Sequence, residues 1–236
     1  MTDLIKSNLA NVKQIIEESA RSAGRHPADI KLLAVSKNFL AQIVLDLAQY
    51  GQQEFAENYV QEGVEKVQYI KKNHPEFDLI WHFIGPLQSN KTRLVAEHFD
   101  WVQSIDRIKI AQRLSEQRPA HLAPLQVCLQ VNIDAGPTKS GVNPALALEL
   151  ADEVRKLPNL ELRGIMTIPD PQTDWDKQVL IHSRAKVIFD QIRNTIASVR
   201  FDTLSMGMSS DINAAIYAGS TMVRVGTALF GERRKT

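Results

Sequence analysis

The chain of 236 residues is 44% hydrophobic and 23% charged, with a formal net charge of +1. This composition is typical of a globular protein long enough to bury a full core. The near-neutral charge gives no electrostatic support for binding nucleic acid or an anionic membrane surface.

The first segment is predicted to be an amphipathic helix. Its apolar residues recur at three- and four-residue spacings on one face, namely Leu4, Leu9, Val12, Ile15, Ile16 and Ala20. Gly24 and Pro27 are expected to end this helix. Charged residues interrupt the apolar ones, so the segment does not resemble a signal peptide.

After this helix, short apolar runs alternate with amphipathic stretches. Strands are expected at 31–36, 54–57, 79–84, 100–104, 125–133, 161–168, 203–206 and 222–225. Helices are expected near 40–50, 59–72, 89–98, 106–117, 144–156, 175–198 and 210–218. Several strand runs are apolar nearly throughout, which is typical of parallel strands covered on both faces.

Eight strands that alternate with helices indicate an α/β fold and favour a single (β/α)8 TIM barrel with an extra N-terminal helix. An open, doubly wound sheet is the alternative, because alternation alone does not show closure. No linker rich in proline, glycine or serine divides the chain, so we expect one domain over residues 1–236.

The cysteine content and the hydropathy favour a cytoplasmic location. The single cysteine, Cys128, excludes an intrachain disulfide, which fits a reducing compartment. Cys128 lies in an apolar run and is expected to be a small buried hydrophobe. No run approaches the length of a membrane span, so we expect no membrane partner.

Lys37 directly follows the first predicted strand. A barrel would place its amine at the carboxyl end of the strands, where barrel proteins carry their sites. Beside apolar side chains a lysine loses solvation, which favours the neutral amine that condenses with an aldehyde. Taken alone, Lys37 also fits a lysine whose stem lies on apolar surface and whose ammonium stays in water.

The loops after the last two predicted strands have the composition of a phosphate site. The first contains Gly207, Ser209 and Ser210 just before a helix, and the second contains Gly226 and Thr227. Barrels often hold phosphate at these two loops, where backbone N–H groups favour an anion. Ser209 equally fits a helix cap and Gly226 a turn residue. An amine for an aldehyde together with a phosphate site makes pyridoxal 5′-phosphate (PLP) the candidate ligand.

Arg224 alternates with Val223 and Val225 in the last predicted strand, so its side chain points either into the barrel or into the helix layer. An inward arginine would suit the ring nitrogen of PLP. Because arginine keeps its protons, it would leave that nitrogen unprotonated and weaken the ring as an electron sink. An outward arginine would pair with a carboxylate.

Other polar residues carry weaker signals. His82 fits a buried core histidine, and Lys139 fits either a solvated lysine or a second amine near the site. The six histidines show no metal-ligand spacing, so we predict no metal site, and no dinucleotide or P-loop motif occurs.

Six segments resemble the pyridoxal phosphate homeostasis protein family, in the same order over nearly the whole chain. They are Ala34–Lys37, Glu57–Glu62, Trp81–Lys91, Lys139–Gly141, Gly207–Asp211 and Val223–Thr227. The stretch from His82 to Lys91 is highly specific. Ala56 departs from the family, which usually has glycine there, but this removes no chemical group.

The resemblance implies a barrel like the N-terminal domain of alanine racemase, here a single PLP-binding domain. By matching position it implies that Lys37 is the Schiff-base residue, that Ser209, Gly226 and Thr227 hold the phosphate, and that Arg224 faces the ring nitrogen. Asn58 and His82 would line the ring pocket, and Met208 would also belong to the cofactor-binding residues. Lys139 would be a second lysine that assists cofactor exchange.

The resemblance also implies a role in vitamin B6 homeostasis that influences amino-acid balance. The protein would bind, buffer and deliver PLP to PLP-dependent apoenzymes, with no catalytic residue. We also expect a monomer, because we do not expect the dimerising domain of the racemases in this chain. The alternative is an amino-acid racemase, which needs a second acid or base opposite the lysine. Racemases of this fold supply it as a tyrosine from an additional β-domain, which we expect this chain to lack. A third hypothesis is a sugar-phosphate enzyme that uses Lys37 as an imine former.

Overall fold

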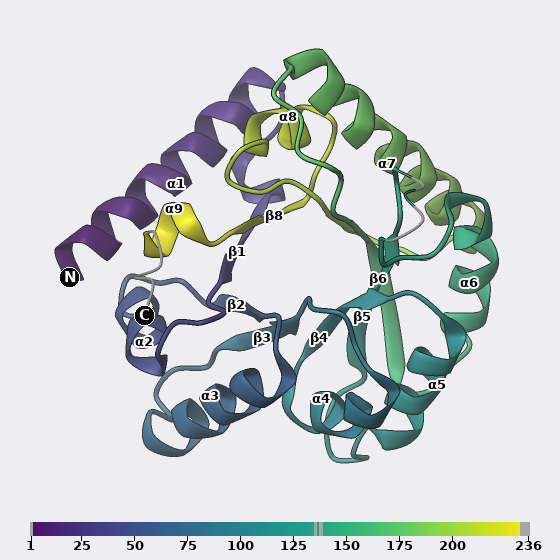
Figure 1. Ribbon diagram of the computed structural model, residues 1–236, viewed down its shortest axis with the longest axis horizontal. Helices are drawn as coiled ribbons and strands as arrows, with labels where there is room; N and C mark the ends of the chain where they lie inside the picture. Colours follow the sequence, from purple (N-terminus) through teal and green to yellow (C-terminus); the bar gives the residue numbers. More distant parts are fainter. Residues whose placement is uncertain (1, 135, 137–138, 232–236) are drawn as a thin grey trace.

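The computed structural model describes residues 2–134, 136 and 139–231. Eight parallel strands in it close into a barrel, with neighbours following chain order and β8 paired with β1 (Figure 1). The strands are β1 (Lys31–Val35), β2 (Glu54–Glu57), β3 (Ile80–Phe83), β4 (Trp101–Ile105), β5 (Leu125–Val131), β6 (Leu160–Thr167), β7 (Thr203–Ser205) and β8 (Met222–Val225). The predicted barrel is confirmed, and the open-sheet alternative is wrong.

Helices surround the barrel on its outer side (Figure 1). They are α1 (Thr2–Ser22), α2 (Ala41–Ala48), α3 (Val60–Asn73), α4 (Thr92–His98), α5 (Ile108–Gln117), α6 (Ala147–Val154), α7 (Trp175–Ile196), α8 (Ile212–Tyr217) and α9 (Thr227–Phe230). Two predicted helices begin as 3-10 turns, Ser89–Lys91 before α4 and Pro144–Leu146 before α6. The sequence did not predict α9, because four residues are too few to show a helical period.

The N-terminal helix α1 lies along the outside of the barrel, over α8 and α9 (Figure 1). Ile5, Leu9, Val12 and Ile16 are buried, and the helix packs mainly on α8, α9 and α2. Leu4 and Ile15, which the spacing placed on the same face, are instead exposed. The Asn8 side chain donates to the Leu229 carbonyl at 2.9 Å, which ties α1 to α9.

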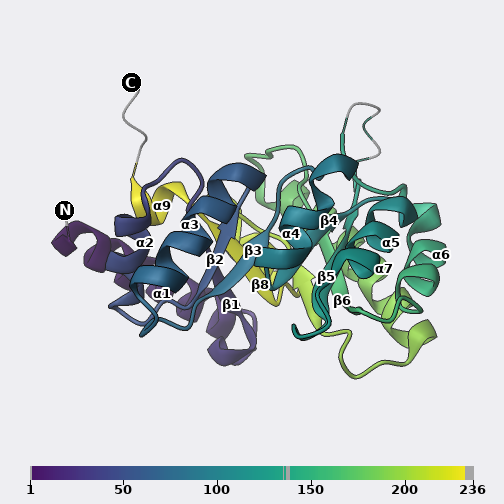
Figure 2. The same cartoon turned by 90° about the horizontal axis from the view of Figure 1, so that it is seen from below.

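Most of the apolar core lies between the strands and the helices, as expected for a TIM barrel. Cys128 is fully buried, as predicted, and packs with Trp101 and Met166. Seen from the side, α9 lies at one end of the barrel (Figure 2). In the described part of the chain, no helix is both long and apolar enough to cross a membrane.

Candidate functional site

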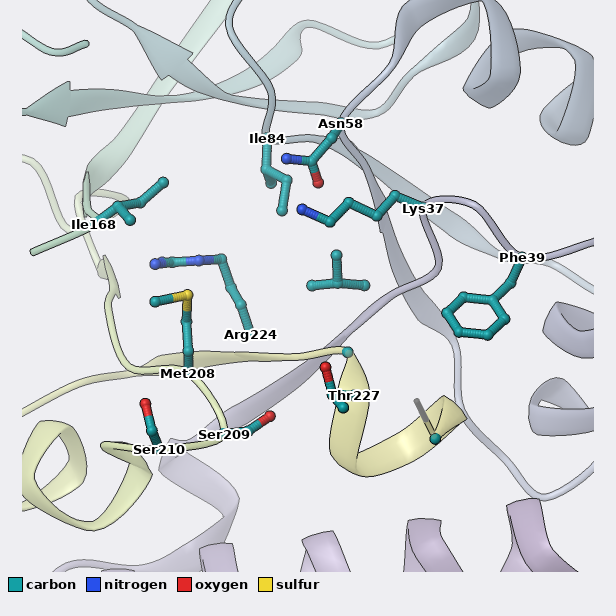
Figure 3. Close-up of a pocket in the computed structure, with 13 residues that line it drawn as sticks. Lys37, Phe39, Asn58, Ile84, Ile168, Met208, Ser209, Ser210, Arg224 and Thr227 are labelled. Atoms are coloured by element: carbon teal, nitrogen blue, oxygen red, sulfur yellow. The ribbon is translucent and has the colours of Figure 1, made fainter. Parts of the chain in front are cut away.

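A cavity of about 440 Å³ opens at the end of the barrel where the strands finish (Figure 3). Its volume falls in the range of small-molecule sites, roughly 300–1,000 Å³. The lining residues follow or end six of the eight strands: Val35, Lys37, Phe39, Asn58, Ile84, Ile168, Met208, Ser209, Ser210, Arg224, Gly226, Thr227 and Gly231. The structure therefore brings together seven of the nine residues predicted to bind the cofactor.

Lys37 and Asn58 extend into this cavity from the turns after β1 and β2 (Figure 3). The Asn58 side-chain Oδ1 is buried and has no hydrogen-bond partner within the described structure. A buried acceptor without a partner is costly, and a ligand with a donor would satisfy it. Asn58 therefore fits a residue whose partner belongs to the bound molecule.

Arg224 points into the barrel, so the alternative of an outward arginine paired with a carboxylate is wrong. The side chain is 3% exposed, and its guanidinium donates to the Ser205 carbonyl, the Ser205 Oγ and the Thr167 carbonyl, each at 2.8 Å. Burial lowers the pKa of Arg224 to about 10, which still leaves the group charged at neutral pH. The site thus contains a fixed buried cation that keeps its protons.

A chain of polar side chains continues from Arg224 through the barrel interior. Ser205 Oγ donates to Gln103 Oε1 at 2.7 Å, and Gln103 Nε2 lies 3.0 Å from His82 Nδ1. The same Nε2 donates to the Met222 sulfur at 3.1 Å. A thioether only accepts hydrogen bonds, so this contact fixes the Gln103 amide orientation. His82 Nδ1 must then accept, which leaves the ring proton on Nε2.

His82 does not line the cavity, in contrast to the expectation that it borders the ring pocket. It is fully buried one layer below, stacked on Trp101 with ring centroids 5.0 Å apart. The reason is strand alternation: Ile84 points the same way as His82 but two residues nearer the cavity, and Ile84 is the lining residue. Burial lowers the pKa of His82, consistent with a neutral ring.

Glu54 lies at the far end of this row of polar side chains, and its carboxyl group should make the stability of the fold depend on pH. Glu54 Oε2 lies 3.2 Å from His82 Nε2, and Oε1 accepts from Lys31 Nζ at 2.8 Å. Burial would raise the pKa of Glu54, but His82 and Lys31 outweigh burial and lower it from 4.5 to about 2. A carboxyl group whose pKa is lower in the folded than in the unfolded protein stabilises the fold at pH values above its unfolded pKa. This stabilisation is lost as the pH falls through the pKa of the folded state.

We therefore expect Glu54 to contribute about 3 kcal/mol at pH 6 and about 1 kcal/mol at pH 2.5. Urea unfolding at both pH values measures this contribution. Between pH 6 and pH 2.5, wild type should lose about 2 kcal/mol more than the Glu54→Gln variant. Equal losses in the two proteins would show that Glu54 is not the group responsible.

The loop after β7 carries Met208, Ser209 and Ser210 into the cavity and is fixed by Asp211. The Asp211 carboxylate accepts from the Met208 N–H at 2.6 Å and lies 2.9 Å from His182 Nε2 on α7. Burial would raise the pKa of Asp211, but these bonds hold it below its usual value. Asp211, not Ser209, occupies the cap position of α8. The Ser209 side chain is therefore not used as the helix cap.

The segment after β8 completes the cavity. Gly226 and Thr227 line it at the start of α9, where the first backbone N–H groups have no partner inside the helix. Phe39 stacks on Phe230 of α9 with ring centroids 4.8 Å apart. Five further residues line the cavity that the sequence analysis did not predict, namely Val35, Phe39, Ile84, Ile168 and Gly231. Only Ile84 had a signal, its two-residue spacing from His82.

Lys139 lies outside the cavity lining, on the loop after β5. Its amine pairs with Asp134 and, at 2.8 Å, with Asp170, and these partners hold the pKa of Lys139 above its usual value despite some burial. Lys139 is therefore held as a charged ammonium between two carboxylates. Within the described residues, no cluster of three or more histidine, cysteine or acidic side chains suits a metal ion.

Known proteins resemble this chain over nearly its full length. The model of the alanine racemase N-terminal domain family matches residues 3–234. A Vibrio cholerae protein named pyridoxal phosphate homeostasis protein is 51% identical over 229 residues, covering 97% of this chain and 96% of its own. The structure of PipY from Synechococcus elongatus with PLP bound is 34% identical, with a TM-score of 0.79 over 92% of this chain and all of that chain. An alanine racemase from Clostridium difficile, 19% identical, shares the fold, with a TM-score of 0.75 over 99% of this chain and 58% of its own.

Proposed function

This chain belongs to the alanine racemase N-terminal domain family and, within it, to the pyridoxal phosphate homeostasis proteins, and we propose that it binds PLP at the barrel mouth. We propose further that it holds the cofactor there for delivery. One observation carries the proposal, which is that Lys37, the buried Arg224 and the small residues Ser209, Ser210, Gly226 and Thr227 border one cavity. The name of the Vibrio cholerae relative and the PLP bound to PipY support the same ligand.

Each part of the cavity suits one part of PLP. When bound, PLP supplies an aldehyde, with which a lysine amine forms a covalent C=N bond and releases water. Lys37 is the amine at the cavity, and Ser209, Gly226 and Thr227 offer hydroxyl and backbone donors to the phosphate. Arg224 would donate to the ring nitrogen, and Asn58 Oδ1 would accept from a donor on the ligand.

A carrier fits this cavity better than a racemase. A racemase needs a second acid or base across the substrate from the lysine. Among the described residues that line the cavity there is no histidine, tyrosine, cysteine or carboxylate. Arg224 keeps its protons and would leave the ring nitrogen unprotonated, which weakens stabilisation of a carbanion. We infer that the protein binds PLP without turning over an amino acid and passes it to PLP-dependent apoenzymes.

The test follows the purified protein through loading and release of PLP. A band near ~420 nm should appear on loading, and borohydride should then fix the cofactor to the peptide containing Lys37, as mass spectrometry would show. Mixing loaded protein with a PLP-dependent apoenzyme should restore that enzyme's activity. Amino acids incubated in D₂O should keep their α-hydrogen, whereas exchange would favour the racemase. No band with excess PLP would exclude both functions.

Thr227 provides a separate test of the phosphate position. Thr227→Val keeps the shape of the side chain and removes the hydroxyl. A hydrogen bond to a charged group is worth about 1.5–3 kcal/mol, so PLP affinity should fall at least about tenfold. Pyridoxal, which lacks the phosphate, serves as the control ligand and should bind both proteins equally. An equal loss for the two ligands would place the phosphate elsewhere.

A further inference from the structure

A buried pair of charged side chains lies beside Lys37 without lining the cavity. Glu57 is the last residue of β2 and Lys66 lies on α3, and their side chains are 0% and 4% exposed. Lys66 Nζ is 2.5 Å from Glu57 Oε1. Removing two charges from water is expensive, and the attraction between them often only offsets that cost. Fold stability alone is therefore a weak explanation for the pair.

The pair is bound directly to the turn that carries Lys37. Ser36 Oγ donates to Glu57 Oε1 at 2.6 Å, and Lys66 Nζ donates to the Ser36 carbonyl at 2.9 Å. On the other side of Lys37, the Asn38 N–H donates to the carboxylate of Glu62, which itself lies 3.2 Å from Lys66 Nζ. Both neighbours of Lys37, Ser36 and Asn38, are thus held by one cluster of charged side chains, which consists of Glu57, Glu62 and Lys66.

The ammonium of Lys66 is fully used in this arrangement. It has three protons and three acceptors, on Ser36, Glu57 and Glu62. The turn itself is tight, since the Phe39 N–H donates to the Ser36 carbonyl at 3.1 Å and Asn38 has φ 64°. Among residues other than glycine, asparagine is one of the few that adopt this conformation readily. A turn of this kind is open to rearrangement unless its surroundings fix it.

We propose that Glu57 and Lys66 are positioning residues that hold the Ser36–Phe39 turn so that the Lys37 amine points into the cavity. The inference rests on the proposed function of Lys37. Holding an amine in the attacking direction raises its effective concentration at a bound aldehyde, so orientation controls the rate of bond formation. Burial raises the pKa of Glu57 and Lys66 opposes this, so loss of Lys66 favours a protonated Glu57 and weakens the hold on Ser36.

The experiment compares two ligands in three variants. Lys66→Met removes the cation. Glu57→Gln with Lys66→Met removes both charges of the buried pair, so neither partner is left as an unpaired buried charge and we expect the fold to be kept. Lys72→Met, at an exposed position of the same helix, is the control. Thermal unfolding checks folding, and fluorescence titration with pyridoxine 5′-phosphate, which lacks the aldehyde, measures binding without bond formation. Borohydride trapping over time measures the rate of PLP attachment to Lys37.

Attachment should slow about tenfold or more in the Lys66→Met and double variants, while the affinity for pyridoxine 5′-phosphate stays within about twofold of wild type. Lys72→Met should match wild type in both measurements. An unchanged attachment rate in the folded double variant would overturn the inference. So would a proportional loss of analogue affinity, because the pair would then support the whole cavity. Failure of wild type itself to bind either ligand would instead overturn the proposed function.

Discussion

Lys37→Ala is expected to abolish covalent attachment of PLP. Lys37 is the one lysine among the described residues that line the cavity. An alanine supplies no nitrogen for the C=N bond, so the band near ~420 nm should be absent at every PLP concentration, and borohydride should fix no cofactor to the protein. The residues proposed to hold the phosphate and the ring are unchanged in this variant, so non-covalent binding of PLP should persist with lower affinity, as a fluorescence titration would show.

Lys139→Ala is the matched control for this experiment. Lys139 also follows a strand, but it pairs with Asp134 and Asp170 and does not line the cavity. This variant should keep the absorbance band and the borohydride adduct at Lys37. An adduct that persists in Lys37→Ala and disappears in Lys139→Ala would show that Lys139, and not Lys37, forms the covalent bond.

Gly85→Ala should destabilise the fold strongly, because it forces apart two turns beside the cavity. A Cβ at position 85 would lie 2.0 Å from the Asn58 carbonyl oxygen and 2.7 Å from its carbon. These are backbone atoms, so the turns after β2 and β3 would have to separate. We expect a loss of about 3 kcal/mol, seen as a fall in melting temperature of roughly 6–10 °C. PLP affinity should fall as well, because Asn58 lines the cavity.

Gly24→Ala separates the effect of this clash from that of losing a glycine. Gly24 has φ +67° and nothing within 4 Å of an added Cβ, so an alanine there introduces backbone strain without a clash. The cost should be about 1 kcal/mol, with PLP affinity unchanged. If the two variants melted at the same temperature, the close packing of Gly85 on Asn58 would not be the cause of the loss.

The sequence predicted the fold because the signals for it are local. Each apolar run and each amphipathic stretch shows its own period, and all eight predicted strands form, with boundaries shifted by at most two residues. Lys37 and the segments 207–210 and 226–227 could be selected because residues that follow parallel strands meet at one end of a barrel. For these residues, position along the chain is enough to indicate position in space.

For Arg224 this reasoning left two directions open, and for His82 it placed the side chain too near the cavity. Alternation gave Arg224 two directions, and only barrel closure decided between them, by placing the Ser205 and Thr167 carbonyls around an inward guanidinium. His82 shares its direction with Ile84, and the depth at which each ends depends on strand stagger, which the sequence does not display. His82 is therefore a buried partner of Gln103 rather than a lining residue.

The sequence by itself determined the barrel, the lysine after its first strand and the composition of the loops at its mouth. The tertiary structure decided which of the polar residues face the cavity and which hold others in place. Glu57 and Lys66 are nine residues apart, and neither looks unusual in the sequence. Their contact with Ser36 depends on how α3 packs beside β2 and reaches the turn after β1. Hydrophobic periods are encoded locally, whereas the pairing of buried polar groups depends on which segments folding brings together.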